Sequence, residues 1–180
     1  MKIFIEIPTW LGDAVMATPA IENILDTYPD AKLIIFGSFV STKLFIGHPN
    51  VDSIIIDDSK KEGNRYKNLF KLAKSVGFVD RAISFRKNFT TKFLFFFIES
   101  KQKFIYKRFD KGLNTHQVIR YNDFINKSLS INTIPNRLKI YLSNKKEKNT
   151  KLVLGLNPGA TYGSAKRWYP NEFAQVAIEL

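Results

Sequence analysis

The sequence predicts an α/β fold, in which a Rossmann-like parallel sheet carries helices on both faces. Two observations lead to this prediction. Short apolar runs typical of buried strands alternate with longer segments in which apolar residues recur at helical spacing. The chain has 180 residues, 44% of them hydrophobic, and is therefore long enough to bury the core that such a fold needs.

The alternation starts directly after Met1 and continues to about residue 128. Strands are expected where isoleucine, valine and phenylalanine cluster, at KIFIEI, KLIIFG, SIIIDD, FVDRAISF and KFIYK. Helices are expected where the apolar spacing lengthens, at Asp13–Tyr28, around Val40, and at Arg65–Ser75, Phe89–Ile98 and Thr115–Ser128. Strands and helices thus alternate along the chain, which favours parallel pairing of the strands.

A polar, charged stretch without apolar periodicity, SNKKEKNTK, follows this region and predicts an interdomain linker. A further strand, LVLGL, and a helix beginning near Pro170 come after it. The sequence therefore predicts a first domain over residues 1–142, a linker over 143–151 and the beginning of a second domain over 152–180.

Composition excludes several kinds of site. Without cysteine the chain has no disulfide, zinc-thiolate site or cysteine nucleophile, and two histidines leave little for a multi-histidine metal site. KIFIEI lacks the longer apolar core of a signal peptide, so we expect no export. The longest apolar run, FLFFFI, is far below the roughly 20 residues that span a bilayer. A cytoplasmic protein in a reducing compartment is expected.

The net charge of +12 predicts attraction to polyanions or to anionic membrane surfaces. Nucleic acid is not the expected partner, because the lysines are spread along the chain and no nucleic-acid-binding motif accompanies them. The stretch KNFTTKFLFFFIESKQKF is rich in phenylalanine and lysine. We interpret it as an amphipathic helix packed on the sheet with its lysines outside, and a face that touches a membrane is the alternative.

The first candidate site is PTWLGDAVMATPAI, where the first strand turns into the first helix. Asp13 fits a helix cap, because a carboxylate there accepts backbone N–H bonds and complements the helix dipole. It also fits a ligand site, since ligands of open α/β sheets bind at the carboxyl ends of the strands and Gly12 permits close approach. Both interpretations can hold together. The motif G-x-G-x-x-G is missing, which argues against a simple dehydrogenase.

The second candidate is the turn after LVLGL, in NPGATYGSAKRWYPNEF. Free N–H groups at Gly159 and Ala160, the hydroxyl of Thr161 and the charge of Lys166 are suited to holding phosphate oxygens. The spacing is not that of a Walker loop. A loop with an exposed lysine and a packed Trp168 explains the pattern equally well, so the residues alone leave both interpretations open.

Together, PTWLGDAVMATPAI and NPGATYGSAKRWYPNEFAQVA resemble the bacterial ADP-heptose:lipopolysaccharide heptosyltransferases of glycosyltransferase family 9, and the segment AKRW resembles the heptosyltransferase II branch. The resemblance implies the two-domain GT-B architecture, with the acceptor bound mainly by the first domain and the nucleotide sugar mainly by the second. Later parts of that second domain have no counterpart before Leu180. The chain is therefore expected to be the N-terminal portion of such an enzyme and inactive alone.

The resemblance implies inverting transfer of heptose from ADP-heptose to the inner-core heptose of lipopolysaccharide. By position in the motifs, Asp13 matches the general base that takes the acceptor proton, and Thr161 and Lys166 match contacts to the donor diphosphate. Gly12 and Gly159 would allow close approach of the donor and its phosphates to the backbone. Turn amides and Lys166 would then stabilise the ADP leaving group, a role that a metal plays in other glycosyltransferases, so no metal or other cofactor is expected.

Basic residues near the predicted site are weaker candidates for acceptor binding. Lys60, Lys61 and Arg65 follow the third strand, and His116 and Arg120 lie one helical turn apart. They would meet the phosphates and acidic sugars of the lipopolysaccharide core at the inner face of the cytoplasmic membrane, where the protein would be peripheral. Two alternatives remain: another nucleotide-sugar or phosphate-ligand enzyme that does not need Asp13, and a non-catalytic basic module whose binding falls steeply with salt.

Overall fold

The computed structural model describes residues 1–61, 63–108, 114–141, 153–159, 165 and 167–180. By its internal contacts the chain divides into two compact units, Met1–Asn144 and Lys145–Leu180. The predicted linker over residues 143–151 lies outside the described residues.

Unit 1 is built on a five-stranded sheet in which every pair of neighbouring strands is parallel, in the order β3-β2-β1-β4-β5. The strands are β1 Lys2–Glu6, β2 Lys32–Gly37, β3 Val51–Ile56, β4 Val79–Ser84 and β5 Ser100–Ile105. The predicted α/β class with a parallel sheet is confirmed.

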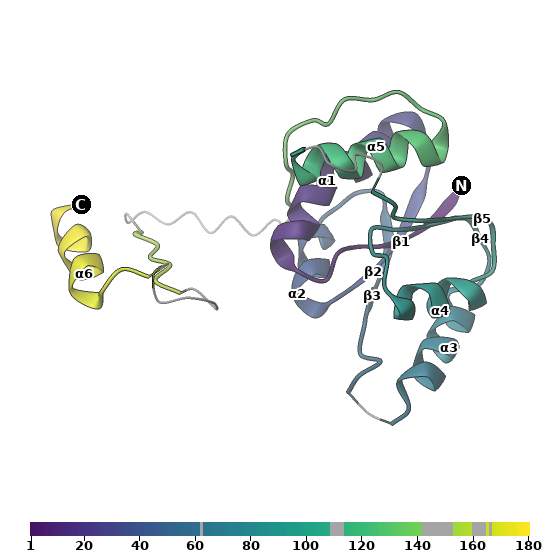
Figure 1. The fold of residues 1–180 in the computed structure, drawn as a ribbon, viewed down its shortest axis with the longest axis horizontal. Helices are drawn as coiled ribbons and strands as arrows, with labels where there is room; N and C mark the ends of the chain where they lie inside the picture. Colours follow the sequence, from purple (N-terminus) through teal and green to yellow (C-terminus); the bar gives the residue numbers. More distant parts are fainter. Residues whose placement is uncertain (62, 109–113, 142–152, 160–164, 166) are drawn as a thin grey trace. The chain divides into compact units, whose positions relative to one another are not determined.

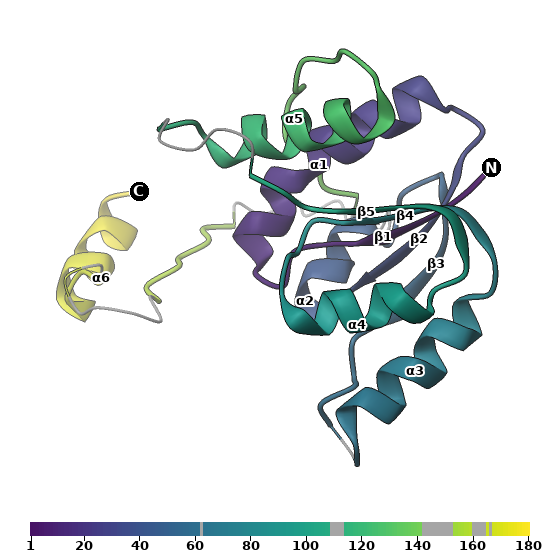
Figure 2. The same ribbon diagram turned by 45° about the vertical axis from the view of Figure 1, so that its right-hand side comes forward.

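Helices cover both faces of this sheet, as the alternation predicts (Figures 1 and 2). The helices of unit 1 are α1 Leu11–Thr27, α2 Phe39–Thr42, the short 3-10 helix η1 Lys43–Phe45, α3 Arg65–Val76, α4 Phe89–Phe97 and α5 Gln117–Leu129. In Figure 2, α1 and α5 lie on one side of the sheet, and α3 and α4 lie on the other.

Successive side chains of a strand point to opposite faces of the sheet, and this explains why the sheet has a core on each face. Ile3 and Ile5 of β1 pack with α1 and α5 in one cluster of buried side chains, while Phe4 packs with α3 and α4 in a second cluster. The Phe4 ring stacks on Phe36 of β2 at 5.8 Å and meets Phe95 of α4 edge-on at 6.0 Å between ring centroids. Strands buried on both faces read as continuous apolar runs, which is why they are easy to recognise in the sequence.

The strand order creates a switch point beside β1. From β1 the chain moves outward through β2 to β3, then returns to place β4 on the other side of β1. The connections that follow β1 and β4 therefore leave toward opposite faces of the sheet at the carboxyl ends of these two strands. Ligands of open α/β sheets bind at such a place.

After α5, residues 131–141 cross back over α1 without regular secondary structure. The carboxylate of Glu22, in α1, anchors the end of this segment. It accepts hydrogen bonds from Lys139 Nζ at 2.6 Å and from the Tyr141 hydroxyl at 2.8 Å, and His48 Nε2 lies 3.1 Å away. Three residues from two distant parts of the chain thus meet around one buried carboxylate.

Glu22 makes the stability of this connection depend on pH. Burial alone would raise the pKa of its carboxyl, but the hydrogen bonds from His48, Lys139 and Tyr141 outweigh burial and lower the pKa from 4.5 to about 2. A carboxyl with a lowered pKa in the folded state stabilises the fold above its unfolded pKa. That contribution, about 3 kcal/mol, is lost as the pH falls from 4.5 toward 2.

We expect Glu22→Gln to lower the free energy of unfolding of the chain at pH 7 by about 2 to 3 kcal/mol. The difference from the unaltered chain should shrink below pH 4.5, because the unaltered carboxyl is then protonated too. Urea unfolding at several pH values measures both effects. Glu99→Gln is the matched control, because Glu99 and Lys74 form an exposed pair that contributes little. Equal losses in the two variants would contradict this role.

Two predicted strands differ from the structure. β5 begins at Ser100, three residues before the predicted start at Lys103. The prediction missed these three residues because they are polar, as expected at the solvent-exposed edge of a sheet. The predicted strand LVLGL is wrong, since its described residues, 153–156, form no strand and are exposed. A strand persists only when paired, and the described part of unit 2 contains no strand with which it could pair. The predicted helix near Pro170 is present as α6, Pro170–Glu179.

Candidate active site

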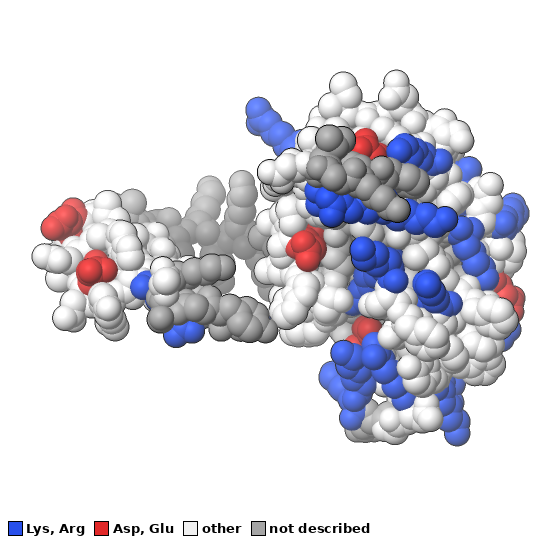
Figure 3. Space-filling view, in the orientation of Figure 1, with Lys and Arg blue, Asp and Glu red and all other residues white. Residues whose placement is uncertain are grey.

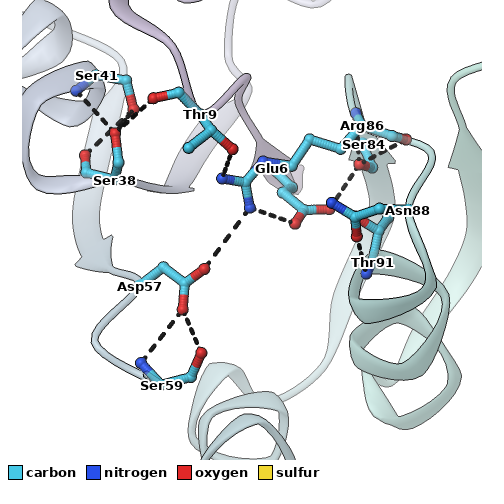
Figure 4. A network of polar contacts seen from close by, with 10 residues as sticks. All are labelled: Glu6, Thr9, Ser38, Ser41, Asp57, Ser59, Ser84, Arg86, Asn88 and Thr91. Carbon is cyan, nitrogen blue, oxygen red and sulfur yellow. Dashed lines mark hydrogen bonds and ion pairs between the residues drawn. The ribbon is translucent and has the colours of Figure 1, made fainter. Parts of the chain in front are cut away.

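Polar side chains converge at the carboxyl ends of four neighbouring strands (Figure 4). The residues are Glu6 at the end of β1, Thr9 in the turn that follows, Ser38 after β2, Asp57 and Ser59 after β3, and Ser84 and Arg86 at and after β4. They come from segments up to 80 residues apart in the sequence. This cluster, which we call the edge network, lies beside the switch point of the sheet.

Arg86 is the centre of the edge network. Its Nη1 donates to Glu6 Oε1 at 3.0 Å and lies 3.7 Å from Asp57 Oδ2, and its Nη2 donates to the Thr9 hydroxyl. The side chains of Arg86 and Glu6 are only 10% and 2% exposed. Ser84 completes the coordination of Glu6 by donating its hydroxyl at 2.6 Å. A buried carboxylate is tolerated because a guanidinium and a hydroxyl satisfy it.

The edge network fixes the turn between β1 and α1. Arg86 binds the side chain of Thr9 from the β4 side, and the Ser38 hydroxyl donates to the Thr9 carbonyl at 2.9 Å from the β2 side. Thr9 is therefore held from both flanking strands. Because Trp10 directly follows it and caps α1, the network also fixes where that helix begins.

Asp13 lies in the first turn of α1 and is half-buried. The cap of α1 is Trp10, which makes no side-chain capping bond, and among the described residues Asp13 has no hydrogen bond or ion pair. The prediction that Asp13 accepts a capping hydrogen bond from the backbone is therefore wrong. Its negative charge in the first turn still complements the helix dipole. The carboxylate is left available for another partner.

Asp13 interacts electrostatically with Tyr121 of α5. Burial raises the pKa of the Tyr121 hydroxyl, and the negative charge of Asp13 raises it further. Tyr121 therefore stays neutral and packs edge-on against Phe85 and Tyr106, with ring centroids 5.2 Å apart in each pair. The side chain that feels the charge of Asp13 thus belongs to a packed group of three aromatic rings.

The space beside the Cα atom of Gly12 is open. A Cβ atom built on it would meet nothing within 4 Å, and its φ is not positive. Neither packing nor backbone conformation in the described residues requires glycine here. The proposal that Gly12 permits close approach of a ligand remains a prediction, and this geometry leaves room for one.

Of the predicted phosphate turn, Gly159 is described, and Ala160, Thr161 and Lys166 lie outside the described residues. A Cβ on Gly159 would lie 3.7 Å from Asn157 Oδ1, an ordinary contact. Trp168, interpreted as a packed anchor, is 59% exposed, and its ring centroid lies 5.6 Å from that of Phe173. No residue of α6 is buried.

The candidate acceptor residues occupy different surroundings. Lys60 is exposed and Lys61 forms an exposed ion pair with Asp58 at 2.9 Å, both just beyond the carboxyl end of β3. Arg65 is the first residue of α3. Arg120 belongs to the first turns of α5, directly before Tyr121, and His116 caps that helix by accepting from Val118 N. The roles of these residues in acceptor binding remain predictions.

Sequence reasoning missed the edge network, although two signals point to it. Glu6 is an acid at the end of a strand whose central residues are apolar, and Arg86 lies two residues after the end of β4. Charged residues at the carboxyl ends of buried strands are candidates for ligand or positioning sites in this class of fold.

Two kinds of feature are absent from the described ranges. No group of three or more His, Cys, Asp or Glu side chains there is arranged to hold a metal ion. Among the same residues, no helix combines the length and the apolar character needed to cross a membrane.

The chain is similar over its whole length to two curated proteins. It is 43% identical to the lipooligosaccharide heptosyltransferase 2 of Campylobacter jejuni serotype O:2 and 43% identical to that of serotype O:6. The chain spans 56% and 57% of the length of these relatives. The resemblance to heptosyltransferases is thus confirmed along the chain and beyond its two motifs. No protein-family model matches the chain.

Solved structures confirm the fold. The crystal structure of a family 9 glycosyl transferase from Veillonella parvula has a TM-score of 0.81 at 21% identity, covering 98% of this chain and 58% of that one. Escherichia coli ADP-heptose lps heptosyltransferase II has a TM-score of 0.75 at 22% identity, covering 99% of this chain and 61% of that one.

Proposed function

We propose that this chain forms the acceptor-side domain and the beginning of the donor-side domain of an inverting glycosyltransferase. The enzyme moves heptose from ADP-heptose to the inner-core heptose of lipopolysaccharide or lipooligosaccharide. The observation that carries this proposal is Asp13, a carboxylate without a protein partner in the described residues, held beside the switch point of the sheet. The 43% identity to two heptosyltransferases supports the choice of donor and acceptor.

Asp13 acts as the general base. As the acceptor hydroxyl attacks the anomeric carbon of the heptose, Asp13 takes its proton, the new glycosidic bond forms and the bond to ADP breaks with inversion. A base must reach the substrate, and a carboxylate already engaged in capping would be less able to do so. The edge network contributes by fixing the start of α1, so that the carboxylate keeps one position.

Donor binding falls to the turn that contains Gly159, Ala160, Thr161 and Lys166. Backbone N–H groups, a hydroxyl and a lysine stabilise the negative charge that grows on the ADP leaving group. With these groups in place the reaction proceeds without a metal ion. Lys60, Lys61, Arg65 and Arg120 contact phosphates or acidic sugars of the acceptor, at the cytoplasmic face of the membrane.

Nucleotide selectivity separates this function from its closest alternative, another nucleotide-sugar enzyme of the same fold. The natural protein that contains this chain should be stabilised against heat by ADP and ADP-heptose, and much less by UDP, GDP or their sugars. Preference for a different nucleotide would favour the alternative enzyme. A basic module without catalysis would show no nucleotide-dependent stabilisation and binding that falls steeply with salt.

Gly12→Ala should impair substrate binding without lowering the free energy of unfolding. Since the new methyl group meets open space, the free energy of unfolding should stay the same or rise by up to about 1 kcal/mol, because alanine favours a helix. If the donor approaches the backbone here, the KM for ADP-heptose should rise about tenfold, equivalent to about 1.4 kcal/mol of binding. Steady-state kinetics together with urea unfolding measures both quantities. An unchanged KM would show that the donor does not approach Gly12.

A further inference from the structure

The outer surface of α3 and α4 carries aromatic rings where a surface helix usually carries polar side chains. On α4, Phe89, Lys92 and Phe96 share the exposed stripe, and Phe89 and Phe96 are 69% and 77% exposed. The opposite side of α4 packs on the sheet through Leu94 and Phe95. The prediction that this helix packs on the sheet with its lysines outside is therefore correct for Lys92, but large apolar side chains are outside as well.

The aromatic rings form a continuous cluster across the two helices. Tyr66 of α3 lies 5.0 Å from Phe93, Phe70 of α3 lies 4.9 Å from Phe97, and Phe96 lies 5.0 Å from Phe97, measured between ring centroids. Tyr66 and Phe70 are themselves 43% and 40% exposed. Isolated exposed apolar residues are normal on proteins, whereas a contiguous patch marks an interaction surface.

Basic residues surround this aromatic patch. On α3, Lys67, Lys71 and Lys74 recur at positions i, i+4 and i+7, and neither α3 nor α4 contains an acidic residue. Residues 65–108 hold 12 of the 28 Lys and Arg residues of the chain but only 2 of its 16 Asp and Glu residues. In Figure 3, blue side chains are spread over unit 1 from α5 to α3 with few red ones between them.

A groove adjoins the patch along β5. It has a volume of about 810 Å³, an apolar floor that includes Phe95 and Phe104, and a rim that includes Lys92, Lys103 and Lys107. The lysines on and after β5 could be explained without a ligand, because lysines protect an exposed edge strand against pairing with other chains. That explanation does not account for the exposed phenylalanines of α4.

We propose that the α3–α4 surface, with the groove beside it, docks on a membrane rich in anionic lipids. The aromatic rings enter the interfacial region, and the surrounding lysines bind lipid phosphates. Charge complementarity selects this partner, because the patch combines apolar contact with positive charge and has almost no acidic side chains. The proposal rests on the proposed function only for the location of the acceptor, which a membrane-docked domain would meet at the lipid surface.

Vesicle co-sedimentation of the 180-residue chain tests the docking. We expect binding to vesicles of equimolar phosphatidylcholine and phosphatidylglycerol, and little binding to phosphatidylcholine alone. Phe96→Ser should weaken binding to the anionic vesicles about tenfold. The matched control Ile134→Ser, at an 85% exposed site on the segment after α5, should not. Lys71→Gln combined with Lys92→Gln should weaken binding and its dependence on salt, whereas Lys2→Gln with Lys32→Gln should have much less effect.

Unchanged binding in the Phe96 variant would overturn the proposal, and so would an equal loss in the Ile134 control. Nucleic acid bound more tightly than the anionic vesicles would also overturn it. Heptose transfer by the natural protein to a water-soluble acceptor without lipid chains is measured in parallel, and Phe96→Ser should leave it unchanged. Failure of transfer in every variant would count against the proposed function, while the vesicle measurement would still decide the role of the surface.

Discussion

Asp13→Asn is expected to lower kcat for heptose transfer by the natural protein about 10²- to 10⁴-fold, the usual contribution of a general base. The amide has nearly the shape of the carboxylate but cannot take the acceptor proton. The KM for ADP-heptose should change little, because Asp13 is assigned to the acceptor side. Steady-state release of ADP measures both constants.

The fold should survive this substitution, because Asp13 has no hydrogen bond or ion pair among the described residues. Asp26 offers a matched control on the same helix, since it is exposed and lies in the last turn of α1, away from the site. Asp26→Asn should leave kcat unchanged. Full activity in Asp13→Asn would remove the general base from the account and would favour a related enzyme that works without it.

Arg86→Met should cause the largest loss of stability, about 3 to 5 kcal/mol in the free energy of unfolding. The substitution removes the partner of Glu6 and leaves that carboxylate buried and uncompensated. It also releases Thr9 on one side, so kcat should fall even in protein that remains folded. Urea unfolding and single-turnover kinetics on the folded fraction measure the two losses.

A double variant distinguishes two causes of the stability loss, the unpaired charge of Glu6 and the loss of packing around Arg86. Combining Arg86→Met with Glu6→Gln should recover much of the stability, because the buried Glu6 carboxylate is then neutral, although Asp57 still loses its contact with Arg86. Lys61→Met is the control for removal of a basic residue, since its ion pair with Asp58 is exposed and contributes little. If the double variant were no more stable than Arg86→Met, the coupling between Arg86 and Glu6 would be refuted.

Much of the fold can be predicted from the sequence, because β1 and β2 at the centre of the sheet are buried on both faces and so appear as apolar runs. The predicted strand KLIIFG coincides with β2 from Lys32 to Gly37. Prediction is weaker at the sheet edge, where the first residues of β5 are polar. It fails for residues 153–156, because a β-like sequence forms no strand without a partner.

The site could be predicted only in part. Asp13 and Gly12 stand in a recognisable turn after the first strand, so motif and topology both point to them. The pairing of Glu6 with Arg86 joins residues 80 positions apart, and that of Glu22 with Lys139 joins residues 117 positions apart. No local periodicity encodes such pairs. They follow from strand order and from the path of residues 131–141, which only the structure provides.

The most direct test of the account is the mass of the acceptor after reaction. The natural protein is incubated with ADP-heptose and an inner-core acceptor that ends in heptose. We expect an acceptor heavier by one heptose, an equal amount of released ADP, and formation of both products about 10²- to 10⁴-fold more slowly with Asp13→Asn at the same enzyme concentration. An unchanged acceptor mass, with a folded protein that still binds ADP, would contradict the assignment of this chain to heptose transfer.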